Sequence, residues 1–276
     1  MLLSGAWESH GGVLAGMKVI LFCGGQGMRL RDYSDSIPKP LVEVGHRPIM
    51  WHLMKYYAHF GHTEFILCLG HGARAIKDYF LNYREWEIND FVLRDGGRSI
   101  ELVRTDIDDW TITFADTGTA ANIGERLQRA RHYLGDDEVF LANYADGLSD
   151  LDLSSYVARF VDSEDVAQFL TVPAPHTFHI VHSDPDGYVN RLEHIARSPV
   201  RVNAGFFVLR REIFDYMRPG DELVTDTFDR LIESRLLRGV HYEGFWQNMD
   251  TFKDKVRLDE IAASGRAPWQ VWDPPA

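Results

Sequence analysis

The sequence predicts an α/β domain with a mostly parallel central sheet covered by helices on both faces, in a Rossmann-like arrangement. Short apolar runs alternate with segments whose apolar residues recur at helical spacing. Glycines and acidic residues follow several of these runs. The chain is 45% hydrophobic and 25% charged, which is the balance of an ordered globular protein.

The elements expected in chain order are a strand at 18–23, a helix at 48–60, a strand at 65–69, a helix at 73–82 and a strand at 138–143. The first run, KVILFC, is continuously apolar and stops at Gly24, as a strand buried on both faces does. The first helix has proline in its first turn and Gly61 just beyond its end. Because ligands bind outside the carboxyl ends of strands in such sheets, we expect the site there.

The remaining segments predict smaller sheets within the same domain. Residues 91–113 form short alternating segments around Asp95-Gly-Gly97, which suggests an inserted hairpin. Residues 169–207 suggest further strands with a turn at 185–187. We therefore expect one domain at 17–276, with a larger half at 17–150 and a small sheet-rich lobe within 151–276.

The first residues and the overall charge exclude several classes of protein. Residues 1–16 lack the basic start and long apolar run of a signal peptide, so we expect a disordered leader, a tag remnant or a start-site extension. The net charge of -12 argues against nucleic acid and anionic membranes as partners. Cys23 and Cys68 lie in apolar runs and are interpreted as buried thiols, which fits a reducing cytoplasm.

A glycine-rich loop, GGQGMRL at residues 24–30, follows the first strand. Its glycines allow backbone N–H groups to approach an anion, and Arg29 adds a forked set of donors. The loop has neither the closing Gly-Lys-Ser/Thr of a P-loop nor the Rossmann glycine spacing, and a tight turn is the simpler alternative. Lys39, between Pro38 and Pro40, supplies a second cation, and two cations favour a diphosphate or triphosphate.

Two acidic residues are candidate metal ligands. Asp146 follows an apolar strand and precedes Gly147, and Asp250 ends a second apolar segment. Two carboxylates at the edge of a sheet, together with phosphate oxygens, suit Mg²⁺ or Mn²⁺. The alternative is that each is a turn residue or a helix cap, as Asp250 before Thr251 would allow.

Six separated motifs occur in one order along the chain: GGQGMRL at 24–30, PKPLVEV at 38–44, IMWH at 49–52, YADGLSDLD at 144–152, NAGFFVL at 203–209 and FWQNMDT at 245–251. Together they resemble the sugar-1-phosphate nucleotidyltransferases, and the nearest branch looks like glucose-1-phosphate cytidylyltransferase. The resemblance extends from Met17 to about Trp269. It implies the GT-A-like fold of that family, with a nucleotide half at 17–150 and a sugar half at 151–276.

The resemblance also implies a reaction and a role for each motif. The sugar phosphate attacks the α-phosphorus of a nucleoside triphosphate, and pyrophosphate leaves. In that scheme Arg29 neutralises the pyrophosphate, Lys39 contacts the α-phosphate, and Asp146 and Asp250 hold Mg²⁺ or Mn²⁺. The residues implied to bind the nucleotide are Gly24, Gly25, Gln26, Gly27 and Gly118. The residues implied to bind the sugar are Glu193 and Asn203.

The chain departs from the family pattern mainly in the sugar half. Met28 replaces a threonine of the glycine loop, and Glu125 places an acid where the branch has glycine, near the nucleotide or the sugar. His194 replaces the lysine that grips the sugar phosphate, and His179 replaces a glycine beside the sugar. The nucleotide and metal half is thus kept, while the sugar-phosphate half is rebuilt.

Two enzyme hypotheses follow. The favoured one is a metal-dependent sugar-1-phosphate nucleotidyltransferase in nucleotide-sugar biosynthesis, with His179 and His194 serving a different sugar. The alternative is a nucleotide-sugar isomerase, mutase or epimerase that has lost nucleotidyl transfer and uses imidazoles for proton transfer. The histidines available for that chemistry are His176, His179, His182 and His194. A non-catalytic sensor ranks last because both acids are present.

The expected partners are a nucleoside triphosphate or nucleotide sugar and a sugar phosphate, with no nucleic acid and no membrane. We expect a cytoplasmic homo-oligomer, because members of the resembled family often assemble. The motifs leave the base and the sugar open.

Overall fold

A computed structural model describes residues 16–25, 37–87, 89–174 and 178–272 of the chain. The leader expected at 1–16 lies outside these ranges except for Gly16. The central sheet contains β1 (Val19–Phe22), β4 (Glu64–Leu69), β7 (Thr111–Asp116), β8 (Val139–Tyr144), β10 (Ala167–Pro173), β13 (Arg201–Asn203), β14 (Phe207–Arg210) and β15 (Leu237–His241).

Four two-stranded sheets surround it within the described residues: β2 (Glu43–Val44) with β3 (Arg47–Pro48), β5 (Phe91–Arg94) with β6 (Ser99–Leu102), β9 (Gly147–Ser149) with β16 (Trp246–Asn248), and β11 (His179–Ser183) with β12 (Val189–His194). The α-helices described are α3 (Ile49–His59), α4 (Ala73–Leu81), α5 (Ile123–Ala130), α6 (Leu153–Val161), α7 (Ile213–Tyr216), α8 (Phe228–Glu233) and α9 (Phe252–Ala263). A short 3-10 helix, η2 (Lys39–Leu41), precedes β2.

The central sheet is parallel at its middle. β1 pairs in parallel with β4 on one side and β8 on the other, and β7 continues the parallel part beyond β4. β14 then pairs antiparallel with β8. β13 and β14 lie antiparallel along one edge of β10, and β15 lies parallel along the other. The predicted fold class, a mostly parallel sheet with covering helices, is confirmed.

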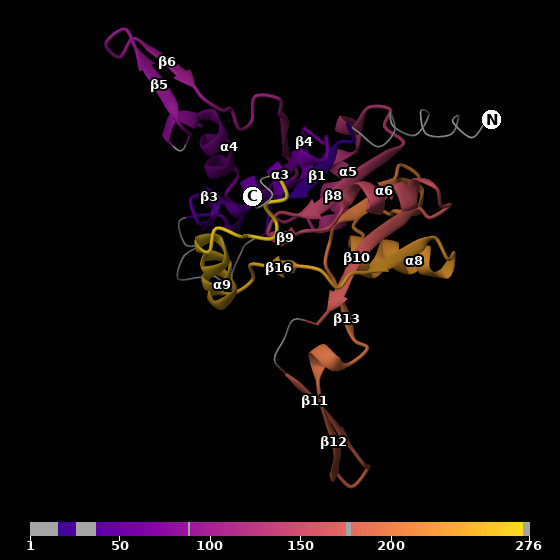
Figure 1. Cartoon of the computed structure of the whole chain (residues 1–276). Coiled ribbons are helices and arrows are strands. Elements are labelled where there is room, and N and C mark those ends of the chain that lie inside the picture. The colour runs from indigo at the N-terminus through magenta and orange to yellow at the C-terminus, as the bar shows by residue number, and fades with distance from the viewer. Residues whose placement is uncertain (1–15, 26–36, 88, 175–177, 273–276) are drawn as a thin grey trace, which may run out of the picture.

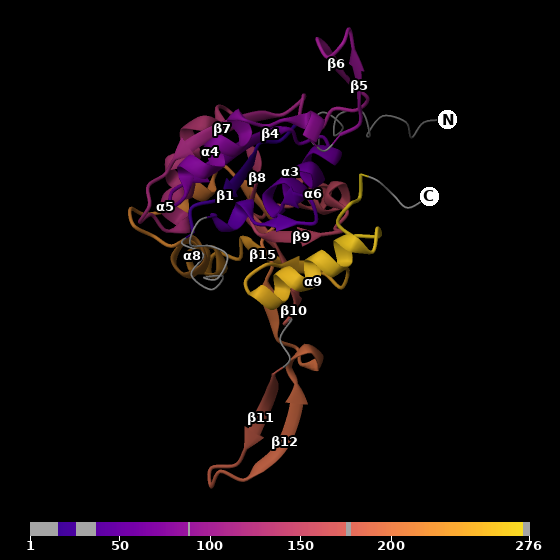
Figure 2. The same ribbon diagram turned by 90° about the vertical axis from the view of Figure 1, so that its left-hand side faces the viewer.

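Both faces of this sheet are covered, which explains the continuous apolar run of β1. Val19 and Leu21 belong to the core that packs against α3 and α6. Ile20 and Phe22 belong to a second core, which packs against α5 and α8. Figure 2 shows α5 and α8 on one side of the sheet and α3, α6 and α9 on the other. Because neither face meets water, no polar residue alternates with the apolar ones.

The predicted elements of the first half match the structure to within a residue or two at their ends. The hairpin expected at 91–113 is β5 with β6, whose turn places Asp95, Gly96 and Gly97 at positive φ. Residues 111–113, however, belong to β7, an edge strand of the central sheet. β7 alternates in the sequence because, as an edge strand, it is only partly buried.

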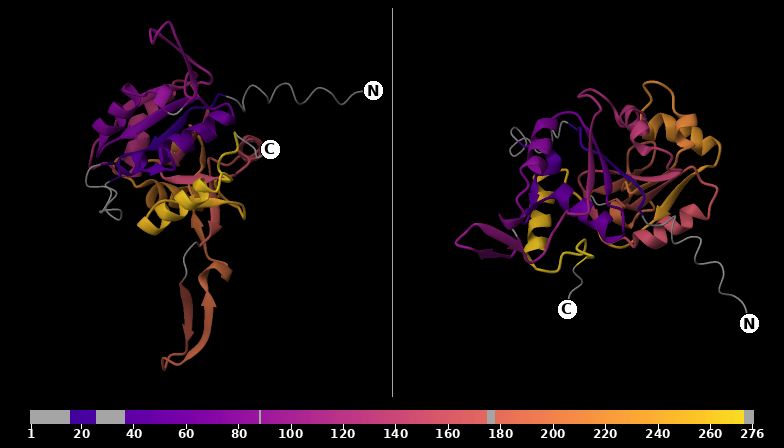
Figure 3. Two further views of the ribbon diagram at one scale, coloured as in Figure 1. Left: turned by 60° about the vertical axis from the view of Figure 1, so that its left-hand side comes forward. Right: turned by 90° about the horizontal axis from the view of Figure 1, so that it is seen from above.

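The second half is more closely joined to the first than the sequence suggests. β10, β13, β14 and β15 extend the central sheet, whereas β11 and β12 form a hairpin that projects from the body (Figures 1 and 3). Cys23 and Cys68 are buried and unpaired, as predicted. Among the helices that the structure describes, none combines the length and the apolar character that a membrane crossing requires.

Candidate functional site

Two acids that are far apart in the sequence meet at the carboxyl end of β8. Asp146 lies between β8 and β9, and Asp250 follows β16. β9 pairs antiparallel with β16, with Gly147 opposite Asn248, and the backbone N–H of Met249 donates to the carbonyl oxygen of Asp146 at 3.0 Å. Backbone hydrogen bonds therefore hold the two carboxylates side by side, at the edge of the sheet where we expect them.

Lys39 joins the two acids. Its Nζ donates to Asp146 Oδ2 and, at 2.6 Å, to Asp250 Oδ1. The backbone of Lys39 is held in η2 between Pro38 and Pro40, where the N–H of Leu41 donates to the carbonyl oxygen of Pro38 at 2.8 Å. Burial alone would lower the pKa of Lys39, but the charges and hydrogen bonds of the two aspartates outweigh it and raise the pKa. The side chain of Lys39 therefore stays protonated between the two aspartates.

A cavity of about 320 Å³ opens beside this cluster. It is lined by Asn143, Tyr144, Asp146, Gly147, Asn203, Ala204, Trp246, Asn248 and Asp250. The amide of Asn248 donates to Asp250 Oδ2 at 2.6 Å, and Asn143 Oδ1 accepts from the backbone N–H of Phe206 at 3.0 Å. Asn203, a predicted sugar residue, accepts from the N–H of Gly205 at 2.9 Å. Carboxylate oxygens and fixed amides in the lining suit the hydroxyl groups of a ligand, and a phosphate beside the two aspartates would need a cation between them.

The described part of the glycine loop lies over a buried arginine that the sequence analysis missed. Arg126 donates to the carbonyl oxygens of Leu69 and Gly24, each at 3.1 Å, and to Thr117 Oγ1 at 2.8 Å. A Cβ on Gly24 would lie 2.1 Å from Arg126 Nη1, so any larger residue there would force the guanidinium to move. Gly25 has open space around it. Gln26, Gly27, Met28 and Arg29 lie outside the described residues.

Burial lowers the pKa of the Arg126 guanidinium, since the three groups that accept its hydrogen bonds are neutral. This positive charge lies among the carboxyl ends of β1, β4 and β7, where an anionic ligand would be attracted. The sequence does contain a signal for Arg126. The segment IGER at 123–126 aligns with the family pattern Thr-Gly-Gly-Arg, so Arg126 stands where the pattern has arginine.

Gly118 and Glu125 follow β7 on the same edge. Gly118 adopts a φ of +87° and donates its N–H to Asp116 Oδ1 at 3.1 Å. Glu125 forms a capping box with Asn122 at the start of α5: the N–H of Glu125 donates to Asn122 Oδ1 at 2.8 Å, and Glu125 Oε2 accepts from the N–H of Asn122 at 3.0 Å. The acid that we expected near the nucleotide or the sugar is accounted for by this helix cap.

His179, Glu193 and His194 lie on the projecting hairpin (Figure 1), and the residues that line the cavity do not include them. The rings of His179 and His194 meet edge to face across the two strands, with centroids 5.1 Å apart. Glu193 Oε2 lies 2.9 Å from Arg191 Nη2 and 3.5 Å from His182 Nε2. The structure thus does not bring these three residues to the Lys39 cluster. His176 lies outside the described residues.

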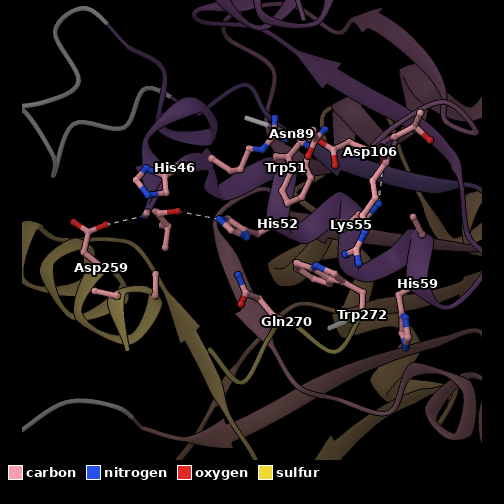
Figure 4. A pocket seen from close by; sticks show the side chains of 18 of the residues that line it. His46, Trp51, His52, Lys55, His59, Asn89, Asp106, Asp259, Gln270 and Trp272 are labelled. Carbon is pink, nitrogen blue, oxygen red and sulfur yellow. Dashed lines mark hydrogen bonds and ion pairs between the residues drawn. The ribbon is translucent and has the colours of Figure 1, made fainter. Parts of the chain in front are cut away.

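A larger cavity of about 870 Å³ lies between α3, α9 and the base of the β5–β6 hairpin (Figure 4). Lys55 from α3 and Trp272 from the C-terminal segment are on its walls. Lys55 Nζ donates to the carbonyl oxygen of Asp106 at 2.9 Å, and Arg47 pairs with the carboxylate of Asp106. None of the predicted site residues lines it, so cavity size alone does not locate the predicted chemistry.

The donor set of the smaller site fits a hard divalent cation. In the described ranges no three His, Cys, Asp or Glu side chains gather as a ready metal site. Mg²⁺ needs no such cage, because it is commonly held by one or two carboxylates together with phosphate oxygens and water. Asp146 and Asp250 direct one carboxylate oxygen each at the same position, which the ammonium of Lys39 occupies.

Comparison with known proteins shows the family. The nucleotidyl transferase family matches residues 18–258. The chain belongs to this family. A probable glucose-1-phosphate cytidylyltransferase of Bacillus subtilis (strain 168) is 33% identical over 258 residues, covering 93% of this chain and 100% of the relative. The glucose-1-phosphate cytidylyltransferase of Salmonella typhimurium (strain LT2) is 33% identical over 259 residues, again with 93% and 100% covered.

Solved structures confirm the nucleotidyltransferase fold. A putative glucose-1-phosphate thymidylyltransferase from Bacillus anthracis superposes with a TM-score of 0.66 at 18% identity, covering 90% of this chain and 95% of that one. The UTP-bound UGPase from Acinetobacter baumannii gives a TM-score of 0.65 at 18% identity, covering 90% and 93%. The predicted membership in the sugar-1-phosphate nucleotidyltransferases is confirmed, and these relatives give no support to the isomerase alternative.

Proposed function

We propose that this nucleotidyltransferase joins a nucleoside triphosphate to a sugar 1-phosphate, releases pyrophosphate and supplies a nucleotide sugar. The observation that carries the proposal is the convergence of Lys39, Asp146 and Asp250 at the carboxyl edge of the sheet, beside the cavity of about 320 Å³. The relatives that match over their full length catalyse a reaction of this kind by name. Positioning and electrostatics are sufficient for such a transfer.

In this mechanism an oxygen of the sugar phosphate forms a bond to the α-phosphorus, and the bond from that phosphorus to pyrophosphate breaks. A bound Mg²⁺ or Mn²⁺ would withdraw charge from the phosphate oxygens. Asp146 and Asp250 would hold that cation, and Lys39 would neutralise charge that develops at the α-phosphate. The fixed amide of Asn203 would orient the sugar from the cavity wall.

The nucleotide would lie across the edge that Gly24 and Gly118 form, with Arg126 below it. The roles of Gly25, Gln26, Gly27 and Arg29 in this proposal rest on their motif. The sugar-phosphate roles of Glu193, His179 and His194 also rest on the motif alone, and the position of these residues on the hairpin argues against them. We take CTP as the nucleotide, because the full-length relatives at 33% identity are named as cytidylyltransferases.

Two further parts of the proposal concern assembly and location. The β5–β6 hairpin has one apolar face and one charged face, and both hairpins expose apolar side chains. In β5–β6, Arg94 and Glu101 pair on the charged face, and Leu93 on the other is 58% exposed. In β11–β12, Leu192 is 63% exposed on a face that it shares with Val181, His179 and His194. Isolated two-stranded sheets are marginal in water, so we propose that copies of the chain cover these faces in a homo-oligomer.

We also propose that the protein works in the cytoplasm, because its two buried cysteines are free thiols and a reducing compartment keeps thiols unpaired.

The test is direct. The protein is incubated with MgCl₂ or MnCl₂, each common nucleoside triphosphate and a panel of sugar 1-phosphates, and pyrophosphate is measured. We expect release with CTP and a hexose 1-phosphate, and loss of release when EDTA removes the metal. Absence of pyrophosphate with every pair would overturn the proposal, above all if a nucleotide sugar is instead converted to an isomer of equal mass.

A further inference from the structure

Lys39 occupies the position at which the two acidic side chains converge. Its ammonium donates to Asp146 Oδ2 and Asp250 Oδ1, and its side chain is 14% exposed. The second oxygen of Asp250 accepts from the amide of Asn248 at 2.6 Å. One carboxylate oxygen from each aspartate is therefore already engaged by a cation that belongs to the protein.

A divalent metal bound by the same two oxygens would need the place of that ammonium. Mg²⁺ lies about 2.1 Å from its oxygen ligands, closer than the 2.6 Å between Lys39 Nζ and Asp250 Oδ1. The metal and the ammonium would then be near-contact like charges, which a partly buried site disfavours. Binding of the metal through these oxygens thus requires that the Lys39 side chain turn away.

The backbone around the cluster is suited to such an exchange, because only the lysine side chain has to move. Asp146 and Asp250 are fixed to each other by the β9–β16 pairing and by the bond from the N–H of Met249 to the carbonyl oxygen of Asp146. The Asp250 N–H also donates to Asp254 Oδ2 at 3.2 Å. Lys39 itself is held at its backbone by η2, between Pro38 and Pro40.

A displaced ammonium in this partly buried place needs a new anion, since an unpaired charge there is costly. The phosphates of a nucleoside triphosphate would supply one, and they would complete the coordination of the metal at the same time. A metal that enters without nucleotide would leave Lys39 without its partners.

We propose that Lys39 is a resident cation that keeps the two aspartates from holding a divalent metal until a nucleoside triphosphate arrives to take its ammonium. The inference rests on the proposed function, which places the metal on Asp146 and Asp250. Its consequence is a positive coupling between metal and nucleotide binding. Because the coupling is reciprocal, each ligand raises the affinity for the other.

The experiment measures Mn²⁺ binding to the full chain by electron paramagnetic resonance, without nucleotide and then with a CTP analogue whose α,β bond cannot be cleaved. Wild type is compared with Lys39→Gln. Without nucleotide we expect Lys39→Gln to bind Mn²⁺ about tenfold more tightly than wild type, because a positive charge has left the site. With the analogue present we expect this advantage to disappear or reverse.

Two variants control the comparison. Lys18→Gln removes a lysine whose Nζ pairs with Asp137 Oδ2 at 2.9 Å at the other end of β1, and it should bind Mn²⁺ as wild type does. The double variant Lys39→Gln, Asp146→Asn should lose the higher Mn²⁺ affinity of Lys39→Gln. That loss would show that the additional Mn²⁺ binds at Asp146. Circular dichroism establishes that each variant is folded.

Equal Mn²⁺ affinity of wild type and Lys39→Gln without nucleotide would overturn the inference, and pyrophosphate release by wild type would then leave the proposed function intact. Conversely, tighter binding by Lys39→Gln in a protein that releases no pyrophosphate with any substrate pair would support the resident cation and remove the transferase reaction. The two failures are therefore distinguishable.

Discussion

The carboxyl edge of the central sheet and the β11–β12 hairpin both carry residues that the sequence assigns to the site, but they are built differently. At the sheet edge Lys39, Asp146 and Asp250 are joined by ion pairs on a hydrogen-bonded frame. On the hairpin His179 and His194 stand on an exposed ribbon whose strands pair with each other. A motif residue thus has defined partners where the central sheet holds its neighbours in place, as at Lys39, and lacks them on the projecting hairpin.

The largest effect should come from Asp146→Asn, which tests the sheet-edge half of the comparison. The amide keeps the size of the side chain and removes a charge that the metal needs, so we expect pyrophosphate release to fall on the order of 1000-fold. Asp152→Asn is the control, because Asp152 in the same motif caps α6 and asparagine caps equally well. A similar loss in both variants would show that the loop, and not the carboxylate, is responsible.

A smaller effect on activity is expected from substitutions of the two described glycines of the glycine-rich loop, Gly24 and Gly25. Gly24→Ala places a methyl group where the Arg126 guanidinium lies, whereas Gly25→Ala meets open space. We expect Gly24→Ala to lower the free energy of unfolding by about 2 kcal/mol, the cost of displacing a hydrogen-bonded buried group, and to reduce activity about tenfold. Urea unfolding and initial rates should leave Gly25→Ala near wild type in stability. If both variants unfold alike, Arg126 does not support the loop.

Much of the sheet edge could be predicted because local sequence determines it. Gly24 and Asp146 directly follow apolar strands, and parallel strands bring such positions to one edge. Arg126 could not be placed in this way, since its three hydrogen-bond acceptors come from the ends of three different strands and become neighbours only in the folded chain. β7 was missed for a related reason: its partly exposed edge position gives it the alternation of a hairpin strand.

The position of the β11–β12 hairpin could not be predicted from motifs. His194 aligns with the lysine that binds the sugar phosphate in the family, but the alignment does not tell how the hairpin is oriented relative to the central sheet. β11 and β12 pair with each other and with no other described strand, so few contacts fix where His179 and His194 lie.

Two histidines of the body, His52 and His62, are buried, unlike the histidines of the hairpin, and their titration makes stability depend on pH. Burial lowers the pKa of His52 and of His62 to about 4 each. The unfolded chain therefore binds protons that the folded chain refuses, so stability is full above about pH 6.5 and falls as the pH drops toward 4. As the pH falls from about 6.5 to about 4, each histidine should lower the free energy of unfolding by up to about 3 kcal/mol.

Urea unfolding between pH 7.5 and pH 4.5 measures this loss. His52→Gln should flatten the slope of unfolding free energy against pH, while His59→Gln, at an exposed end of α3, should leave the slope unchanged. If the slope of unfolding free energy against pH is the same in His52→Gln and in wild type, then His52 is not a residue that takes up a proton on unfolding.

The smallest effect should come from the hairpin itself, where His179→Ala and His194→Ala are combined. The geometry predicts that kcat and the KM for the sugar 1-phosphate change less than about threefold, since neither ring lines the cavity beside Asp146. Initial rates over a range of sugar 1-phosphate at saturating nucleotide measure both constants. A rise of about tenfold in that KM, with the KM for the nucleotide unchanged, would return His194 to the role that the motif implies and would place the hairpin beside the sugar during turnover.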